Sequence, residues 1–265
     1  MNSSSVGIYS VHHEKVDSIL RRETLLLATS MKRTTAYQGC EHYSPSEFDT
    51  ILFDLDGTLA DTAPDLLFAL NRLIREEDGR SLSLEEILPF ISHGSRAMVQ
   101  RGFEMEPDNP DFTRLVERFL DIYHDNVMVH TRLFPGMEKA LERIEARFMT
   151  WGIVTNKIAR FTEPLLAALG LARRAACIVS GDSTEFRKPY PEPLLFACAQ
   201  TGTTPDHCLY VGDAPKDVEA GKRAGARTAV ALFGYISENE APEKWGADCL
   251  ISSPQDIVDW LGSFS

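Results

Sequence analysis

From residue 49 to the end of the chain, short apolar runs alternate with segments whose apolar residues recur at helical spacing. The first run, 50–53, is followed directly by Asp54, which is typical of a buried parallel strand. Similar runs occupy 149–155, 176–180, 208–212, 228–233 and 249–252. Helical spacing marks 138–146, 161–169, 193–200, 217–224 and 255–261. This alternation predicts an α/β fold with a doubly wound parallel sheet.

One long interval, between Asp54 and Met149, breaks the alternation of strands and helices. It covers about 95 residues and contains no convincing strand pattern. Helical spacing occurs within it at 65–75, 84–88, 95–102 and 111–127. We therefore expect a smaller helical domain inserted after the first strand. It would lie over the carboxyl ends of the strands, where open α/β sheets bind their ligands.

Residues 1–47 differ from the rest of the chain. They are rich in Ser, Thr and His, carry five acidic and five basic side chains, and show no periodicity. Such a segment is typical of a flexible extension, with an interaction arm as the less favoured alternative, and Met31 offers a later start. The expected organisation is an extension over 1–47, a core made of 48–63 and 132–265, and a helical cap over 64–131.

The overall charge narrows the classes of partner. With 39 acidic and 27 basic side chains the net charge is −12, which argues against nucleic acid and anionic membranes because both need a basic face. No apolar run approaches the roughly 20 residues of a membrane span. Five widely spread cysteines without a Cys-x-x-Cys pair predict neither a disulfide framework nor a zinc knuckle, and favour a cytoplasmic protein. A small anionic substrate remains compatible, because a metal ion and one lysine reverse the sign locally.

The most informative motif stands at the end of the first predicted strand, where Asp54 and Asp56 flank one residue and Gly57 follows. One carboxylate can attack a phosphorus atom to give an aspartyl-phosphate, while the other protonates the leaving oxygen and then activates water. Such carboxylates approach a phosphate only when the charges are screened, so we expect Mg²⁺ as cofactor. The alternative is an ordinary Asp-Gly turn at a strand end.

Three later strand ends carry matching polar groups. Thr155 and Asn156 offer a hydroxyl and an amide to a phosphate oxygen, although both are also common helix caps. Lys188 lies in a loop stiffened by prolines, where a held ammonium offsets phosphate charge, whereas most loop lysines are simply solvated. Asp213 and Asp217 suit Mg²⁺ as hard oxygen ligands, although a helix dipole alone would also favour Asp217.

Taken together, these motifs resemble the four motifs of the haloacid dehalogenase-like hydrolases, in order and in context. They are Asp54-x-Asp56-Gly57-Thr58, Thr155-Asn156, Lys188-Pro189 and Gly212-Asp213-x-x-x-Asp217. The resemblance extends from about residue 49 to the end of the chain. It implies a Rossmann-like core with a helical cap after the first motif.

The resemblance also implies a role for each matching residue. Asp54 would be the nucleophile and Asp56 the general acid and base, with Lys188 beside them in the catalytic set. The phosphate would be held by Thr155, Asn156 and Lys188. The ligands of Mg²⁺ would be the Asp54 carboxylate, the Asp56 backbone carbonyl and Asp213, with Asp217 in support. A second aspartate at position 56 separates the chain from the dehalogenases, whose leaving halide needs no acid.

Within the family, the chain resembles the phosphoglycolate phosphatase group. Its similarity is closer still to the branch of N-acetylmuramic acid 6-phosphate phosphatases of cell-wall recycling. The stretches that carry this similarity are 91–98, 133–137, 151–157, 233–236 and 245–248. Tyr190 departs from the family pattern, which commonly has Asp or His between the prolines. A small phosphorylated metabolite is therefore the expected partner, with 2-phosphoglycolate and N-acetylmuramic acid 6-phosphate both open.

The cap is expected to choose the substrate. Ser95 and Arg96 stand at a predicted helix start and are candidate substrate-binding residues, since Arg96 suits a carboxylate. The alternative is an ordinary solvated arginine. Two other functions remain as alternatives. One is a phosphomutase with His93 as its extra acid or base, and the other is a non-catalytic phosphate-binding regulator. A monomer and a homodimer are both compatible with the sequence.

Overall fold

The predicted apolar runs form one parallel sheet in the computed structural model, which describes residues 43–262. Its strands are β1 Thr50–Phe53, β4 Thr150–Val154, β5 Ile178–Val179, β6 Cys208–Gly212, β7 Arg227–Ala231 and β8 Cys249–Ile251. Their order is β5-β4-β1-β6-β7-β8, and all neighbours are parallel. Strands are therefore added on both sides of β1, which confirms the predicted doubly wound α/β fold.

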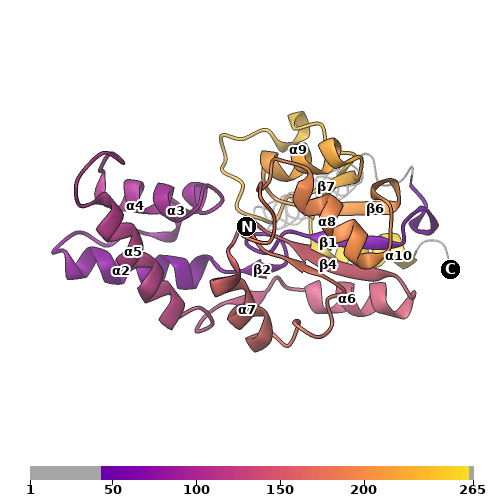
Figure 1. Ribbon diagram of the computed structural model, residues 1–265, viewed down its shortest axis with the longest axis horizontal. Coiled ribbons are helices and arrows are strands. Elements are labelled where there is room, and N and C mark those ends of the chain that lie inside the picture. The colour runs from indigo at the N-terminus through magenta and orange to yellow at the C-terminus, as the bar shows by residue number, and fades with distance from the viewer. Residues whose placement is uncertain (1–42, 263–265) are drawn as a thin grey trace, which may run out of the picture. The chain divides into compact units, whose positions relative to one another are not determined.

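Helices cover the two faces of this sheet. They are α6 Met137–Ala146, α7 Ala159–Ala168, α8 Glu192–Thr201, α9 Pro215–Ala224 and α10 Pro254–Gly262. In Figure 1, α8 and α9 lie on one side of the strands and α6 on the other. All four residues of β1 are buried. A strand covered on both faces has no polar face, which explains why β1 was recognisable as an uninterrupted apolar run.

Four further helices are inserted between β1 and β4, as predicted. They are α2 Ala63–Glu76, α3 Leu84–Ile91, α4 Ser95–Phe103 and α5 Phe112–Asp125. Along α5 the buried residues recur three and four positions apart, because this spacing places them on one face of a helix: Phe112, Leu115, Val116, Phe119, Ile122 and Tyr123. Below, the helices α2–α5 are called the cap.

Two short strands at the base of the cap correct the expectation that this interval holds no strand. Ala60–Asp61 (β2) and Arg132–Leu133 (β3) pair in antiparallel fashion. Strands of two residues are too short to show alternation of apolar and polar positions, so the pattern misses them. The buried Asp65 reinforces the junction, because it accepts hydrogen bonds from the backbone nitrogen atoms of His130 and Thr131, both at 2.8–2.9 Å.

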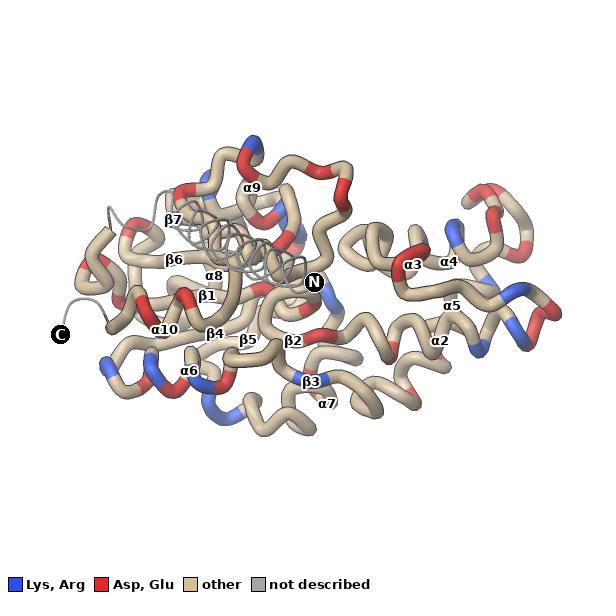
Figure 2. Tube along the Cα trace, turned by 180° about the vertical axis from the view of Figure 1, so that it is seen from behind, with Lys and Arg blue, Asp and Glu red and all other residues tan. Residues whose placement is uncertain are grey.

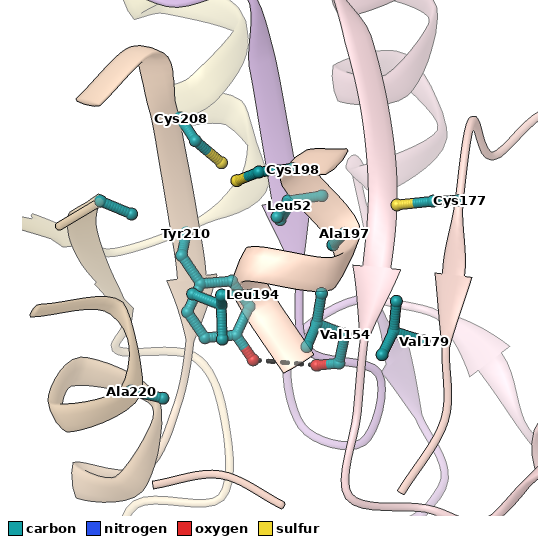
Figure 3. Packing of buried hydrophobic residues seen from close by; sticks show 11 residues of the cluster. Leu52, Val154, Cys177, Val179, Leu194, Ala197, Cys198, Cys208, Tyr210 and Ala220 are labelled. Carbon is teal, nitrogen blue, oxygen red and sulfur yellow. Dashed lines mark hydrogen bonds between the residues drawn. The ribbon is translucent and has the colours of Figure 1, made fainter. Parts of the chain in front are cut away.

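The interior between α8, α9 and the strands is a close-packed apolar cluster, shown in Figure 3. In this view the sulfur atoms of Cys198 and Cys208 point toward each other, and the hydroxyl of Tyr210 donates to the carbonyl of Val154 at 2.9 Å. Cys177, Cys198 and Cys208 are free thiols. Cys249 in β8 is disulfide-bonded, a bond that the cysteine spacing does not predict.

Charged side chains of both signs are mixed along the surface helices. Figure 2 shows basic and acidic positions interspersed along α6, for example. Within residues 43–262, no helix has the length and apolar character needed to cross a bilayer.

The described chain starts inside the segment predicted as an extension. The short 3₁₀ helix Pro45–Glu47 begins at a capping box formed by Ser44 and Glu47. The carbonyl of Tyr43 accepts a hydrogen bond from Nε1 of Trp260 in α10, at 3.0 Å. These contacts tie residues 43–47 to the core. The rest of the predicted extension, 1–42, lies outside the described residues, and the predicted boundaries of core and cap stay predictions.

Candidate active site

The carboxyl ends of β1, β4 and β6 form one edge of the sheet. Phe53, the last residue of β1, pairs with Ile153 on one side and Val211 on the other. This register brings the polar residues that follow the three strands, among them Asp54 and Asp213, to the same edge. The strand order reverses beside β1, and such a reversal point is where doubly wound sheets bind ligands.

Asp54 is buried at this edge, with 6% of its surface exposed. Its Oδ1 accepts a hydrogen bond from the backbone nitrogen of Leu55 at 2.8 Å and lies 3.0 Å from Nζ of Lys188. Burial raises the pKa of Asp54, although the Lys188 ammonium acts in the opposite direction. The carboxylate is thus oriented through one oxygen, which leaves Oδ2 for a ligand.

Lys188 is a fully enclosed cation with three oxygen partners. Its Nζ lies 2.7 Å from Oδ1 of Asp217, 2.7 Å from the hydroxyl of Tyr210 and 3.0 Å from Asp54. Burial disfavours the charged ammonium, but Asp217 and Asp54 outweigh burial and raise the pKa of Lys188. Lys188 therefore remains protonated next to the candidate nucleophile.

Asn156 holds the loop that carries Lys188. Its Oδ1 accepts from the backbone nitrogen of Lys188 at 3.0 Å, and its Nδ2 donates to the carbonyl of Lys188 at 2.9 Å. Both ends of the amide are therefore engaged with one residue. The structure gives Asn156 a supporting contact that the motif did not indicate, while Thr155 and Asn156 both line the cavity beside Asp54.

Three carboxylates gather around one point. Oxygen atoms of Asp54, Asp213 and Asp217 all lie within 4.8 Å of one another. Asp213 accepts hydrogen bonds from the backbone nitrogen of Tyr235 at 2.8 Å and from Oγ1 of Thr58 at 3.2 Å. Burial, followed by the charges of Asp217 and Asp54, raises the pKa of Asp213 to about 8.

This donor set fits a hard divalent cation. Three buried carboxylates face a single enclosed ammonium, so negative charge is in excess, and carboxylate oxygens are the ligands that Mg²⁺ prefers. Gly57 makes the close approach possible: its φ is +80°, and a Cβ at this position would lie 2.1 Å from Oδ2 of Asp213. The Asp-x-Asp-Gly motif therefore needs glycine for both space and backbone conformation.

Asp56 has a different environment from Asp54. Its Oδ1 accepts hydrogen bonds from Nζ of Lys157 at 2.8 Å and from Oγ1 of Thr62 at 2.5 Å. Burial on its own would raise the pKa of Asp56, but the Lys157 ammonium and these hydrogen bonds outweigh it and lower the pKa. The pKa of Asp54 is thus raised and that of its neighbour Asp56 is lowered, because the Asp54 carboxylate is buried and faces other carboxylates whereas the Asp56 carboxylate faces Lys157 and Thr62.

A cavity of about 350 Å³ opens in front of these groups. The sheet edge supplies its polar wall, which includes Asp54, Asp56, Thr155, Lys157, Arg187 and Lys216. Its apolar wall is made by Leu66, Ile91, Met98, Phe119 and Leu120 of the cap, with Ile158 and Phe161. Nζ of Lys216 also donates to the carbonyl of Ser92, so cap and core meet across the cavity.

The structure brings only part of the predicted cap site to this cavity. Ser95 lines it. Arg96 is not among the lining residues, and its guanidinium carbon lies 4.7 Å from the ring centre of Phe112 instead. His93 also lies outside the cavity lining, in another surface depression, with Nδ1 at 2.9 Å from the carbonyl of Pro89.

Sequence reasoning missed several residues at the site. Lys157 directly follows Thr155-Asn156, and this position at a strand end was the only signal for it. Lys216 directly precedes Asp217, and this position beside a motif residue was likewise its only signal in the sequence. Tyr123 of α5 lines the cavity but follows the ordinary apolar spacing of a cap helix, so nothing in the sequence distinguishes it from core.

Several known proteins are similar to this chain in sequence. The family described as haloacid dehalogenase-like hydrolase matches residues 51–231. An N-acetylmuramic acid 6-phosphate phosphatase from Pseudomonas aeruginosa is 40% identical over 212 residues, which cover 80% of this chain and 93% of that protein. A phosphoglycolate phosphatase from Xanthomonas campestris is 38% identical and covers 78% of this chain and 93% of its own length.

A solved structure extends the similarity to three dimensions. The crystal structure of a predicted phosphoglycolate phosphatase from Haemophilus somnus superposes with a TM-score of 0.72 at 28% sequence identity. The match covers 80% of this chain and 97% of that chain.

Proposed function

The chain belongs to the haloacid dehalogenase-like hydrolases and is a phosphoric monoester hydrolase, and from this premise we propose that it cleaves a small phosphomonoester through an aspartyl-phosphate. The observation that carries this proposal is the placement of Asp54. Its carboxylate faces the cavity, is oriented through Oδ1 alone, and has Lys188 at 3.0 Å.

In the first step, an oxygen of Asp54 forms a bond to phosphorus as the ester P–O bond breaks. The electron pair of that bond stays on the leaving oxygen, which takes a proton from the carboxyl group of Asp56. The enclosed ammonium of Lys188 offsets negative charge on the phosphoryl group and the nucleophile without having to reorganise.

In the second step, the carboxylate of Asp56 takes a proton from water, whose oxygen attacks phosphorus. The bond to Asp54 breaks, and phosphate and a free carboxylate are released. The lowered pKa of Asp56 keeps its carboxylate ionised, which is the protonation state that accepts a proton from water. For the acid role Asp56 must carry a proton, so its contact with Lys157 has to loosen when the leaving group enters.

We propose Mg²⁺ as the cofactor, held by Asp54 and Asp213 with Asp217 in support and with the backbone carbonyl of Asp56 as a further ligand. The excess of buried carboxylate charge supports this assignment. When bound, the ion would screen the repulsion between Asp54 and the phosphate and polarise a phosphoryl oxygen.

The cavity favours N-acetylmuramic acid 6-phosphate over 2-phosphoglycolate as substrate. Both esters carry a carboxylate, which suits the cationic groups Lys157, Arg187 and Lys216 on the polar wall. Only the amino sugar also has a ring, an N-acetyl methyl group and a lactyl methyl group. These parts would contact the apolar wall from the cap, whereas a two-carbon acid leaves that wall without a partner.

The two alternative functions have less support. A phosphomutase needs an additional acid or base in the cap, and the only candidate named for it, His93, does not line the cavity. A non-catalytic phosphate-binding protein would lack a nucleophile or a ligand of the metal, whereas Asp54, Asp213 and Asp217 are all present and close together. A cytoplasmic location and a monomeric or homodimeric state stay predictions.

Phosphate release from a panel of esters tests the proposal. We expect Asp54→Asn to abolish Mg²⁺-dependent release from p-nitrophenyl phosphate, because an amide is not a nucleophile toward phosphorus. Asp49→Asn is the matched control, since Asp49 is exposed at the other end of β1. Undiminished release by Asp54→Asn would contradict the mechanism.

The same assay decides the substrate. We expect kcat/KM for N-acetylmuramic acid 6-phosphate to exceed that for 2-phosphoglycolate by at least about tenfold, the value of one or two additional apolar contacts. A preference for 2-phosphoglycolate would overturn the substrate assignment and leave the aspartyl-phosphate mechanism intact.

A further inference from the structure

The hydroxyl group of Tyr123 is buried without a hydrogen-bond partner. Tyr123 is 1% exposed, and its hydroxyl and one oxygen of Glu192 are the buried side-chain polar atoms in residues 43–262 for which no partner is present. Most buried hydroxyls in proteins are hydrogen-bonded, because an unpaired one forfeits its hydration without compensation. Tyr123 also lines the cavity in front of Asp54 and Asp56, so the unpaired group is at the site.

The ring of Tyr123 is held in place from two sides. It stacks on Phe119 of the same helix, with ring centres 6.4 Å apart, and packs against Phe161 of α7, at 5.5 Å. A tyrosine hydroxyl lies in the ring plane, so a fixed ring also fixes the position of the hydroxyl. The group cannot turn away to find a partner elsewhere.

Lys157 occupies the space beside this ring. Its Nζ lies 4.8 Å from the ring centre of Tyr123 and 2.8 Å from Oδ1 of Asp56. An ammonium has three N–H donors, and the side chain reaches this position through a flexible four-carbon stem. Lys157 and Tyr123 both line the cavity, so an oxygen that enters beside them can contact the ammonium and the hydroxyl together.

We propose that Tyr123 is a specificity-determining residue whose hydroxyl, together with the ammonium of Lys157, binds an acceptor oxygen of the substrate's leaving group. The inference rests on the function proposed above. The bound oxygen lies close to the ester bond, because Lys157 also contacts Asp56, the proposed proton donor to the leaving oxygen. Carboxylates, sugar hydroxyls and ring oxygens all have this chemistry.

The hydroxyl acts as a donor in this contact. Burial raises the pKa of Tyr123 to about 12, although the neighbouring Lys157 ammonium lowers it through its charge and its side-chain contact. The group therefore keeps its proton at neutral pH, and both Tyr123 and Lys157 offer hydrogens. A substrate with no acceptor near the ester oxygen gains nothing from the pair, which makes the pair selective for oxygen-rich leaving groups.

Tyr123→Phe tests the proposal, because it removes the hydroxyl and keeps the ring that packs on Phe119 and Phe161. We expect the ratio of kcat/KM for N-acetylmuramic acid 6-phosphate to that for p-nitrophenyl phosphate to fall about tenfold, the value of one lost hydrogen bond to a buried donor. The same ratio is measured with 2-phosphoglycolate, so that a carboxylate and a sugar oxygen are distinguished. Tyr43→Phe, which loses a hydroxyl bonded to Asp248, is the matched control.

Thermal stability separates this role from a structural one. In the free protein the hydroxyl has only the neighbouring Lys157 ammonium beside it and no well-formed hydrogen bond, so the melting temperature of Tyr123→Phe should stay close to that of the wild type. Combining Tyr123→Phe with Lys157→Met should cost less than the sum of the two single effects on the ratio, since both side chains act on one oxygen.

Three results would overturn the inference: an unchanged ratio with both natural esters, equal losses on all substrates, or a lowered melting temperature with no change in the ratio. Calorimetric binding of the same esters to Asp54→Asn, with and without Tyr123→Phe, keeps the test independent of turnover. If the wild type hydrolyses none of the esters, the proposed function fails, while about tenfold weaker binding in this experiment would still support the role of Tyr123.

Discussion

The core and the cap contribute to the same cavity in opposite ways. On the core side, charged groups are held by fixed partners: Lys188 has three oxygen partners, and Asp56 has two donors. On the cap side, the wall is mainly apolar, and the one buried hydroxyl, that of Tyr123, is unpaired. The core is organised before any ligand arrives, whereas the cap is completed by the ligand. We therefore expect turnover and substrate preference to respond to different substitutions.

Lys188→Met should have the largest effect on the core side. It removes the cation between Asp54 and Asp217, and we expect kcat to fall by about a thousandfold, the scale seen when a preorganised electrostatic partner is lost. Steady-state rates on p-nitrophenyl phosphate would measure this loss.

Two further variants make the result on Lys188 interpretable. Lys139→Met alters an exposed lysine of α6 and should leave the rate unchanged. Lys188→Arg keeps the positive charge but replaces the compact ammonium with a larger planar guanidinium. It should recover little activity, because the enclosed site fits an ammonium. A Lys188→Met enzyme with near-normal kcat would show that the core side does not depend on this cation.

The acidic cluster predicts a pH-dependent response to Mg²⁺. In the metal-free protein the raised pKa of Asp213, about 8, means that the folded state binds this proton more tightly than the unfolded state. The contribution of this proton to the stability of the folded protein is fully present below the pKa that Asp213 has in the unfolded chain. It is lost as the pH rises through about 8. A cation that replaces the proton should therefore raise the melting temperature more at about pH 8 than at about pH 6.

Differential scanning calorimetry with millimolar MgCl₂ against EDTA measures this response. We expect a difference of a few degrees between the two pH values for the wild type and no such difference for Asp213→Asn. A larger gain at the lower pH would mean that the cation does not replace the proton of Asp213.

The same contrast explains what could be predicted from the sequence. The strands of the core are buried on both faces, so they stand out as apolar runs, and Asp54 and Asp213 directly follow two of them, whereas Lys188 lies in the loop after β5. The contact between Lys157 and Asp56 depends on side-chain direction, and the place of Tyr123 depends on how α5 meets Phe161 of α7, neither of which a local pattern records. The sequence therefore does not predict the roles of Lys157 and Tyr123, although the place of Lys157 directly after Thr155-Asn156 points to the site.

Arg96→Ala provides the smallest expected effect and the sharpest test of the cap. The sequence favours Arg96 as a partner for a substrate carboxylate, but the structure stacks its guanidinium on Phe112, away from the cavity lining. We expect kcat/KM for both natural esters to change less than about twofold, because the Arg96 guanidinium does not line the cavity. Its exposed cation–π contact contributes only about 0.5–1 kcal/mol to local stability, so the fold should also tolerate the change. Arg187→Ala is the matched comparison, because Arg187 does line the cavity and should cost several-fold more. If Arg96→Ala instead lowers kcat/KM by more than about tenfold while Arg187→Ala is silent, the cap supplies a charge to the substrate, and the division between a charged core and an apolar cap fails.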